Sequence, residues 1–344
     1  MAIEELEFER VLISIKIGAE EFLFAPPKKK PIQQTYVSHL TNLLFAPPED
    51  NSSMIVSDSQ AEQLALVIKD ATTLRSFHIH KYQFSKIGLQ HLAAGLLYNN
   101  SITKLVFSEN DLRYEGVRIL SNALTAKTNQ ILTSLAIIDN NLQSQNSTDL
   151  SSIFQINSLT DIDLSGNYID DKVVKFIFKA IANNVNSRLT RLSLASNIIS
   201  ENGARIIAEN LGKCKQLQAL DLDNNQLGDI GAQYIAEMLK YYNSLRGLQI
   251  RDNHITTKGV QTLVNAVCDK RSRLVLFCFA PHRECHFDSS KNKIGADAAE
   301  DLLTLLRTRN IFLDNWNTTT ILQDIVGDSK LVNNQPTRVR RYSF

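Results

Sequence analysis

The residues best suited to chemistry in this chain are four potential metal ligands within nine positions, Cys278, His282, Cys285 and His286. Thiolates and imidazoles are ligands that zinc favours in proteins. Closed zinc sites use two separated pairs of ligands that clamp two chain segments, whereas Cys285 and His286 are adjacent and their side chains diverge in most backbone conformations. The favoured interpretation is a loop, with Cys278 buried in a strand and the histidines in solvent. A zinc site is the less favoured alternative.

Other catalytic motifs are absent from the sequence. It contains no GxxxxGK[ST] phosphate-binding loop, no GxSxG nucleophile elbow and no HExxH zinc motif. Cys268, next to Asp269, is interpreted as a core residue of a helix. We therefore expect no enzyme activity and no cofactor.

A repeated phrase determines which elements position the remaining polar residues. Each copy has an apolar residue, two spacers, two apolar residues separated by one spacer, two further spacers, an asparagine, a spacer and a last apolar residue. Copies begin 27 to 30 residues apart, at positions 74, 102, 132, 159, 189, 217, 245 and 274, the first and last being degenerate. A period in this range indicates a solenoid of stacked units.

The asparagine of each copy stands where the chain bends. Its amide group both donates and accepts hydrogen bonds, so stacked copies are expected to form a ladder of contacts to the backbone. The asparagines concerned are Asn110, Asn140, Asn167, Asn197, Asn225 and Asn253, while Tyr82 takes this position in the first copy.

Each copy predicts a strand followed by a helix. The alternating apolar residues have the period of a strand with one buried face. After the bend, apolar residues such as Ala204, Ile207 and Leu211 recur at the spacing of one helical stripe, introduced in most copies by a glycine. Because helices are wider than the strand spacing of about 4.8 Å, the sequence predicts an α/β horseshoe with parallel strands on its concave face and helices on its convex face.

The LxxLxLxxNxL phrase, its period and the glycine-led helix resemble the ribonuclease-inhibitor-like leucine-rich repeats. The resemblance covers roughly residues 55–310 and implies the leucine-rich repeat solenoid fold. It is specific for the fold and says little about function.

Three regions are predicted along the chain. Residues 1–54 form an N-terminal capping region that contains the duplicated segments Phe24-Ala25-Pro26-Pro27 and Phe45-Ala46-Pro47-Pro48. Residues 55–310 hold about eight repeats, beginning with the helix of a partial repeat at 59–70. Residues 311–344 form a C-terminal cap and a basic tail that contains Arg338, Arg340 and Arg341.

Composition indicates a soluble monomer of the cytoplasm. The net charge of +1 argues against general nucleic-acid binding. The N-terminus carries four glutamates in its first ten residues where a secretory signal would be basic and apolar, and no apolar stretch approaches the length of a membrane helix. Four cysteines do not make a disulfide framework for 344 residues. The four N-glycosylation sequons, which begin at Asn51, Asn99, Asn146 and Asn317, are interpreted as chance.

The spacers of the phrase are expected to face the concavity as a grid of variable side chains. Val106 and Ile138 are expected to form an exposed apolar spot within a charged field, as in an interface with a modest centre and a polar rim. Charge reversal at Asp161, Asp163, Asp221 and Asp223 is expected to weaken binding and leave stability nearly intact. The candidate partner-binding residues are Arg75, His78, His80, Lys81, Lys104, Val106, Ile138, Asp139, Asp161, Asp163, Arg191, Asp221, Asp223, Arg246, Gln249 and Arg251.

The first hypothesis for function is a non-enzymatic scaffold that binds one protein partner through its concave face. The degenerate repeats and the richness in Asn, Ile and Lys resemble single-domain leucine-rich repeat effectors that intracellular bacteria deliver into the host cytosol. The partner would then be a host protein, or a bacterial enzyme held inactive. A regulator of a small GTPase is the alternative, although such proteins typically end in an acidic segment and this tail is basic. A zinc-dependent activity at Cys278–His286 is the third hypothesis.

Overall fold

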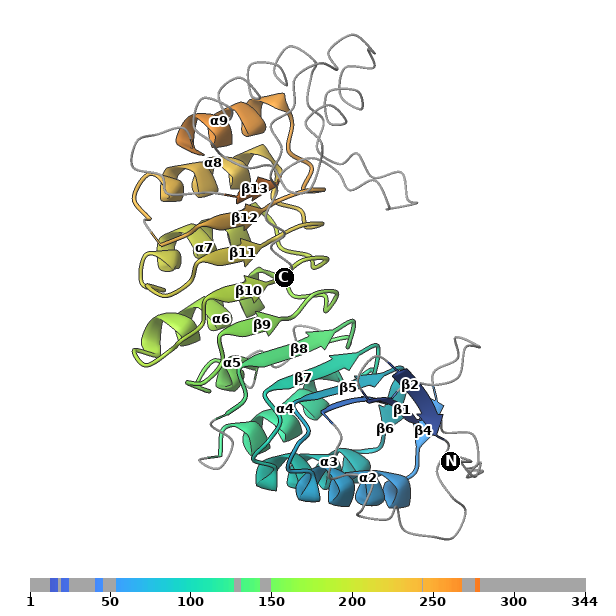
Figure 1. Ribbon diagram of the computed structural model, residues 1–344. Coiled ribbons are helices and arrows are strands. Elements are labelled where there is room, and N and C mark those ends of the chain that lie inside the picture. The colour runs from blue at the N-terminus through green and yellow to red at the C-terminus, as the bar shows by residue number, and fades with distance from the viewer. Residues whose placement is uncertain are drawn as a thin grey trace. The chain divides into compact units, whose positions relative to one another are not determined.

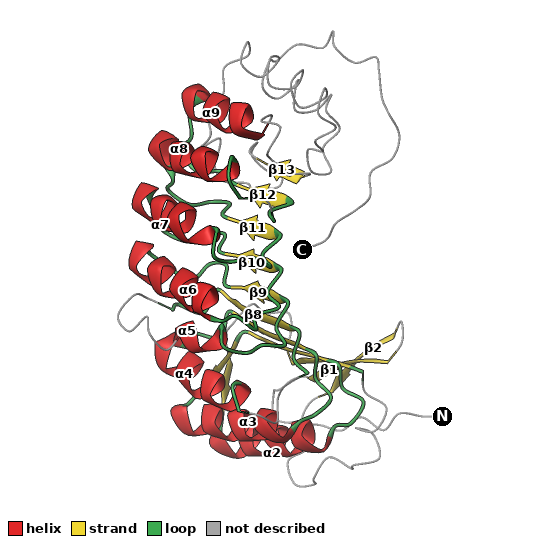
Figure 2. Ribbon diagram, turned by 90° about the vertical axis from the view of Figure 1, so that its left-hand side faces the viewer, coloured by secondary structure: helices red, strands yellow, loops and turns green. Residues whose placement is uncertain are grey.

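The structure of this protein is a computed structural model (Figure 1), which describes residues 13–17, 20–24, 41–45, 54–126, 131–142, 150–242, 244–267 and 276–278. The chain forms two compact units, unit 1 at Met1–Ser193 and unit 2 at Leu194–Phe344. Within each unit the described helices lie along one side of a sheet (Figure 2). The opposite side of each sheet is called the strand face below.

Unit 1 alternates strands with helices. Its strands are β1 (Ile13–Ile17), β2 (Glu20–Phe24), β3 (Asn42–Phe45), β4 (Met54–Val56), β5 (Ser76–His80), β6 (Tyr82–Phe84), β7 (Lys104–Ser108), β8 (Ser134–Ile138), β9 (Asp161–Asp163) and β10 (Arg191–Ser193). Its helices are α2 (Asp58–Asp70), α3 (Lys86–Tyr98), α4 (Arg113–Leu124), α5 (Leu150–Ile153) and α6 (Asp171–Asn183). The main sheet has the order β10-β9-β8-β7-β5-β3-β1-β2, and β4 pairs with β6 separately.

Unit 2 continues the same alternation. Its described strands are β11 (Ala219–Asp221), β12 (Gly247–Gln249) and β13 (Leu276–Cys278), which are parallel neighbours in that order. Its described helices are α7 (Glu201–Leu211), α8 (Gly228–Leu239) and α9 (Thr257–Val267), and α8 packs against both of the others.

The register of the parallel strands follows the repeated phrase. Leu105 of β7 lies opposite Phe77 of β5 on one side and opposite Leu135 of β8 on the other, so equivalent positions stack. All three side chains are buried, and so are the apolar faces of the following helices. One continuous core is thereby shared between neighbouring copies, as expected for units that cannot bury their apolar faces alone.

Glycine in the first turn of the helices permits close packing between copies. Gly231 of α8 and Gly259 of α9 lie inside their helices rather than before them. A Cβ atom at Gly259 would lie 2.3 Å from Asp229 Oδ1 and 2.6 Å from Ile255 Cγ2, closer than side chains approach one another. The glycines are therefore explained by packing rather than by helix initiation.

The asparagine ladder is present. Asn140 donates its amide to the carbonyl of Phe107 in the preceding copy at 3.0 Å, and its Oδ1 accepts the backbone N–H of Asn110 at 3.2 Å. In unit 2, Asn225 donates to the carbonyl of Leu194 at 3.0 Å and accepts the N–H of Ile199 at 3.0 Å. Each asparagine is buried, so the ladder satisfies backbone groups that water does not reach.

The duplicated Phe-Ala-Pro-Pro segments follow two strands that flank β1. Strand β1 is antiparallel to both β2 and β3, and Ile13 lies opposite Phe24 on one side and Phe45 on the other. Each phenylalanine is the last residue of its strand. Both strands therefore stop at the same register, one residue before a proline pair that cannot donate backbone hydrogen bonds to the sheet.

The predicted fold class, an α/β leucine-rich repeat solenoid with parallel strands on one face and helices on the other, is confirmed. The helix predicted at 59–70 is α2, and the serine before it forms a capping box with Gln60. The region boundaries at 54 and 310 stay predictions, because much of the chain on the outer side of each lies outside the described residues.

Candidate functional site

The strand face of unit 1 begins with a cluster of two histidines around one serine. His78 and His80 both project from β5, and Ser108 ends the neighbouring β7. The Ser108 hydroxyl lies 2.7 Å from His78 Nε2 and 2.9 Å from His80 Nδ1. Because a serine carries a single hydroxyl proton, it donates to one ring and accepts from the other.

Burial and the groups around this cluster keep His78 neutral at pH 7. Burial, followed by the nearby His80 and Lys104, lowers the pKa of His78 to about 4. Glu109, which follows Ser108, lies 3.6 Å from Lys81 Nζ and 3.9 Å from His80 Nδ1. The predicted basic character of this region therefore comes from Arg75, Lys81 and Lys104 at neutral pH, and not from His78.

The serine and histidines do not form a hydrolytic triad. In such a triad the carboxylate holds the nitrogen of the base that faces away from the nucleophile. Here Glu109 approaches His80 Nδ1, which is the same atom that meets Ser108. The cluster is thus a fixed polar surface, with its geometry set by the register of β5 and β7.

The prediction of an exposed apolar spot at Val106 and Ile138 is wrong for Val106. Val106 is only 9% exposed, whereas Ile138 is partly exposed. Val106 lies in register between His78 and Ala136 on the flanking strands, so its neighbours leave little of its surface accessible. In this row of the sheet, Val106 and Ala136 lie between His78 and Asp163.

The acidic residues of β9 are bound to neighbouring side chains. Asp161 forms an ion pair with Arg191 of β10 and accepts the Thr160 hydroxyl at 2.5 Å. Asp163 accepts the backbone N–H and the hydroxyl of Ser165, at 3.0 and 2.5 Å. Both carboxylates are therefore held in fixed positions.

Asp139 differs from these acids, because no hydrogen bond or ion pair holds its carboxylate among the described residues. Partial burial, together with Glu109 and Asp163, raises the pKa of Asp139 above its usual value. Its side chain lies over Gly166, whose φ is +71° and whose Cβ position would be 1.8 Å from Asp139 Oδ1. Only glycine fits there.

Left-handed backbone recurs immediately before the bend in every copy whose bend is described and is no marker of a special site. The residue that precedes the asparagine, or Tyr82 in the first copy, has a φ between 51° and 71°. The recurrence shows that the bend itself requires this conformation, even though it costs energy in residues other than glycine. The positions are Lys81, Glu109, Asp139, Gly166, Ser196, Asn224 and Asp252.

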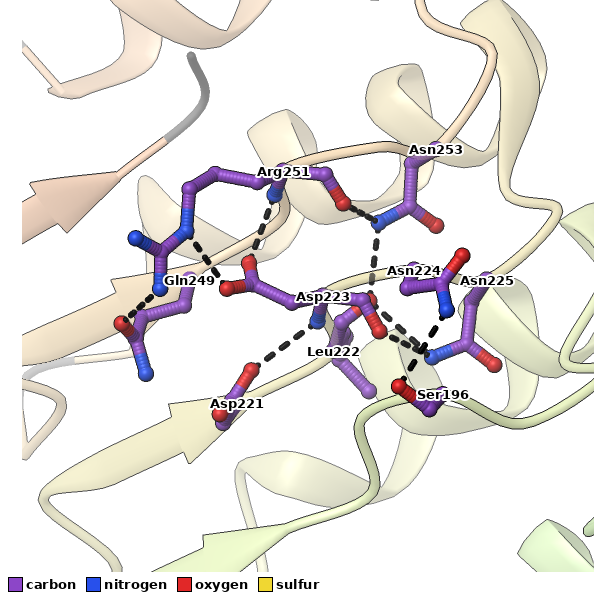
Figure 3. A network of polar contacts seen from close by, with 9 residues as sticks. All are labelled: Ser196, Asp221, Leu222, Asp223, Asn224, Asn225, Gln249, Arg251 and Asn253. Atoms are coloured by element: carbon purple, nitrogen blue, oxygen red, sulfur yellow. Dashed lines mark hydrogen bonds and ion pairs between the residues drawn. The ribbon is translucent and has the colours of Figure 1, made fainter. Parts of the chain in front are cut away.

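The strand face of unit 2 contains a buried ion pair, shown in Figure 3. Arg251 Nε donates to Asp223 Oδ2 at 2.6 Å, and the backbone N–H of Arg251 donates to Asp223 Oδ1 at 2.6 Å. The two side chains are only 13% and 15% exposed. Burial and the neighbouring Asp221 raise the pKa of Asp223, and Arg251 opposes this rise.

Two expectations fail at this network. Gln249 was predicted to face a partner, but it is 3% exposed and accepts a hydrogen bond from Arg251 Nη2 at 2.8 Å. Its register partners on the two flanking strands are Asp221 and Cys278. Since Asp223 is buried and paired, reversal of its charge is no longer expected to leave stability intact.

The remaining arginines of the predicted grid lie at the start of their phrases. Arg75 is exposed, and its Nη1 donates to the carbonyls of Thr72 and Ser101 at 3.2 and 3.1 Å. Arg246 is partly exposed and donates to the carbonyl of Leu245 at 3.3 Å. Both side chains are thus directed partly to the backbone.

A column of threonines on the strand side was missed by the sequence reasoning. Each hydroxyl donates to the backbone carbonyl of the equivalent residue one copy earlier, always at 3.1 Å. The same carbonyl also accepts two backbone N–H groups of the next copy. The recurrence of threonine at one phrase position would have revealed it: Thr103, Thr133, Thr160 and Thr190.

A second set of missed residues links the ends of successive helices. Asn99, after α3, donates to the carbonyls of Ile68 and Ala71 at 2.7 and 2.9 Å. Its side chain is 2% exposed, which is incompatible with a glycan at this sequon in the folded protein. In unit 2, the hydroxyl of Tyr242 donates to the carbonyls of Cys214 and Leu217.

Three of the four candidate zinc ligands lie outside the described residues. Cys278 lies in β13, while His282, Cys285 and His286 lie outside the described residues. Within the ranges that the structure covers, no group of three or more His, Cys, Asp or Glu side chains is arranged to hold a metal ion. No helix in those ranges is both long and apolar enough to span a bilayer.

Comparison with known proteins finds matches to leucine-rich repeat proteins. A family model described as "Leucine Rich repeat" matches residues 213–236 and 243–264. NACHT, LRR and PYD domains-containing protein 14 of Mus musculus is 30% identical over 145 residues, which are 42% of this chain and 14% of that protein. NACHT, LRR and PYD domains-containing protein 13 of Homo sapiens is 32% identical over 109 residues, which are 31% of this chain and 10% of that protein.

The chain thus matches only a small part of each mammalian relative, and these relatives give no support to an origin as a bacterial effector. Among solved structures, an internalin from Listeria monocytogenes is 15% identical, with a TM-score of 0.41 and coverage of 88% of this chain and 90% of that one. TLR13, from a TLR13–ssRNA13 complex, is 15% identical, with a TM-score of 0.42 and coverage of 79% and 39%. From the repeats, the sheet and helices built on them and the matching family model, we conclude that the chain is a leucine-rich repeat protein.

Proposed function

We propose that this protein is a non-enzymatic scaffold that binds a protein partner through its strand face. The observation that carries the proposal is that variable polar side chains on this face are already held in place by neighbours. Ser108 fixes the two histidines in unit 1, and Arg251 fixes Asp223 in unit 2. Side chains that are ordered before binding lose little conformational entropy on docking, which favours recognition by a rigid surface.

Within this proposal the protein is a cytoplasmic monomer, and its partner is another protein rather than nucleic acid. The charges of unit 1 support a protein partner, because cationic residues near β5 are followed by acidic residues near β8 and β9. An interface with both signs of charge gives specificity for a complementary surface and repels a uniform polyanion. An enzyme held inactive is a partner of this kind.

The test is a comparison of captured proteins between the wild type and two charge variants. Lys104→Glu changes an exposed residue of the strand face, and Lys175→Glu changes an exposed residue of helix α6 as a matched control. Immobilised proteins of equal melting temperature would be exposed to lysate of the source cell, and bound proteins would be quantified by mass spectrometry. We expect a partner that Lys104→Glu loses at least about tenfold and Lys175→Glu retains. Equal capture by both variants would place the interface elsewhere.

A further inference from the structure

The histidine cluster and the cations beside it form one end of the unit 1 strand face. We propose that this end, formed by Arg75, His78, His80 and Lys104, receives an acidic segment of the protein partner and takes up a proton as it does so. The inference rests on the proposed function, since it assigns the chemistry of the partner and the regulation of the same face. Three features of this face support it: an excess of cations, two imidazoles with unused nitrogens, and acids that limit the length of the ligand.

Cations outnumber carboxylates at this end of the face. Lys104 is exposed and has no ion-pair partner among the described residues. Arg75 is positioned by two backbone carbonyls through Nη1, and no described carboxylate pairs with it. Among the described residues, the acid in contact with the cluster is Glu109, which lies close to Lys81 and His80. The local field therefore favours an anionic ligand.

The imidazoles add hydrogen-bonding capacity to these charges. Ser108 contacts Nε2 of His78 and Nδ1 of His80, and the second nitrogen of each ring makes no hydrogen bond within the described residues. The ring centroids lie 5.9 Å apart with an edge-to-face orientation, so the two rings form one compact cluster. Protonated imidazoles donate from both nitrogens and match carboxylate acceptors.

Acidic residues further along the face define the type of anion. Asp139 follows β8 and Asp163 ends β9, the next strands of the same sheet, and Asp163 is one cause of the raised pKa of Asp139. A long polyanion such as single-stranded nucleic acid would run into this negative region, whereas a short acidic peptide segment would not. The distribution of charge therefore fits an acidic segment of a protein.

Binding of such a segment is coupled to protonation of His78. The groups that face it are His80 on its own strand, Lys104 and Ser108 on β7, and Glu109 after β7, while β3 on the other side carries no titratable residue. Burial, His80 and Lys104 keep the pKa of His78 near 4 in the free protein. A bound carboxylate favours the charged imidazole and raises this pKa, so the complex holds more protons than the free components, and affinity must rise as pH falls.

The experiment titrates the protein with a hexaaspartate peptide and follows the histidine ring signals by NMR, with assignments from His78→Gln and His80→Gln. We expect the pKa of His78 to rise on saturation with the peptide. If it returns to its ordinary value, binding at pH 5.5 is about tenfold tighter than at pH 7.5. The His78→Gln variant should lose most of this dependence on pH, and Lys104→Glu should weaken binding at both pH values.

Control ligands separate the outcomes. A hexaglutamine peptide that binds as well as hexaaspartate, or a pKa of His78 that does not move, would overturn the inference, and so would preferential binding of oligothymidylate. These results are independent of the capture experiment. A partner that Lys104→Glu loses, together with a flat pH dependence in wild type, would leave the protein-binding proposal standing and remove the proton-coupled acidic site.

Discussion

The bend of each repeat and its strand face differ in how they use polar residues. At the bend, one residue type performs one task in successive copies, as Asn140 and Asn225 do when they bind the backbone of the copy before them. On the strand face, equivalent positions hold different residues, such as His78 in unit 1 and Asp221 in unit 2. The repeated side chains satisfy the protein's own backbone, and the varied ones satisfy each other. Repetition therefore marks structure, while variation marks where recognition can be encoded.

The ion pair between Asp223 and Arg251 in unit 2 does not fit this distinction easily. Its residues are not repeated from copy to copy, yet both side chains are largely buried. We expect Arg251→Met to cost about 4 kcal/mol of unfolding free energy at pH 8, because it leaves the Asp223 carboxylate buried without its cation. The pKa of Asp223 is already raised by burial and by Asp221. Without Arg251, which opposes this rise, the pKa of Asp223 is higher still, so the native variant binds more protons than the native wild type and the cost decreases as pH is lowered to 5.

Urea unfolding at pH 5 and pH 8 measures this effect. The double variant Arg251→Met/Asp223→Asn removes the buried charge and is expected to recover part of the loss at pH 8. A cost below about 1 kcal/mol at pH 8 would show that the pair is a surface feature, and the strand face of unit 2 would then resemble that of unit 1.

Two asparagines of the ladder, Asn140 and Asn110, differ in the number of hydrogen bonds that their side chains make. Asn140→Ala removes donors to the carbonyls of Phe107 and Ile138 and the acceptor for the N–H of Asn110, which leaves buried backbone groups unpaired. We expect a loss of about 2–3 kcal/mol. Asn110→Ala removes one donated bond, to the carbonyl of Tyr82, and the Oδ1 of Asn110 has no hydrogen-bond partner among the described residues. Its loss is expected to be about 1 kcal/mol, measured by the same urea unfolding. Equal losses would mean that the ladder does not strengthen inside the array.

The ladder was predictable from sequence, and the strand-face contacts were not. The phrase gives each position its face, since strand periodicity separates buried from outward residues, and it therefore predicted the burial of Leu105 and of Asn140. The phrase could not predict that Val106 and Gln249 are buried, because the exposure of an outward side chain depends on the residues around it in the folded chain. Nor could it pair Asp223 with Arg251, because many combinations of charges lie within reach on adjacent strands.

The smallest expected effect concerns Tyr82, which occupies the position that asparagine has in the later copies. Its ring is fully buried and stacks on Phe45 at 4.1 Å between centroids, but its hydroxyl is buried without a hydrogen-bond partner among the described residues. Tyr82→Phe keeps the stacking and removes the unsatisfied hydroxyl, so we expect stability to be unchanged or to rise by up to about 1 kcal/mol. Tyr242→Phe is the matched control, since that hydroxyl donates to the carbonyls of Cys214 and Leu217 and its removal should cost about 1–2 kcal/mol. Opposite signs in thermal unfolding would show that Tyr82 stabilises this copy through its ring and not through its hydroxyl, in keeping with its stacking on Phe45 of β3. A loss at Tyr82 equal to that at Tyr242 would mean that its hydroxyl has a partner after all, and that the ladder begins one copy earlier.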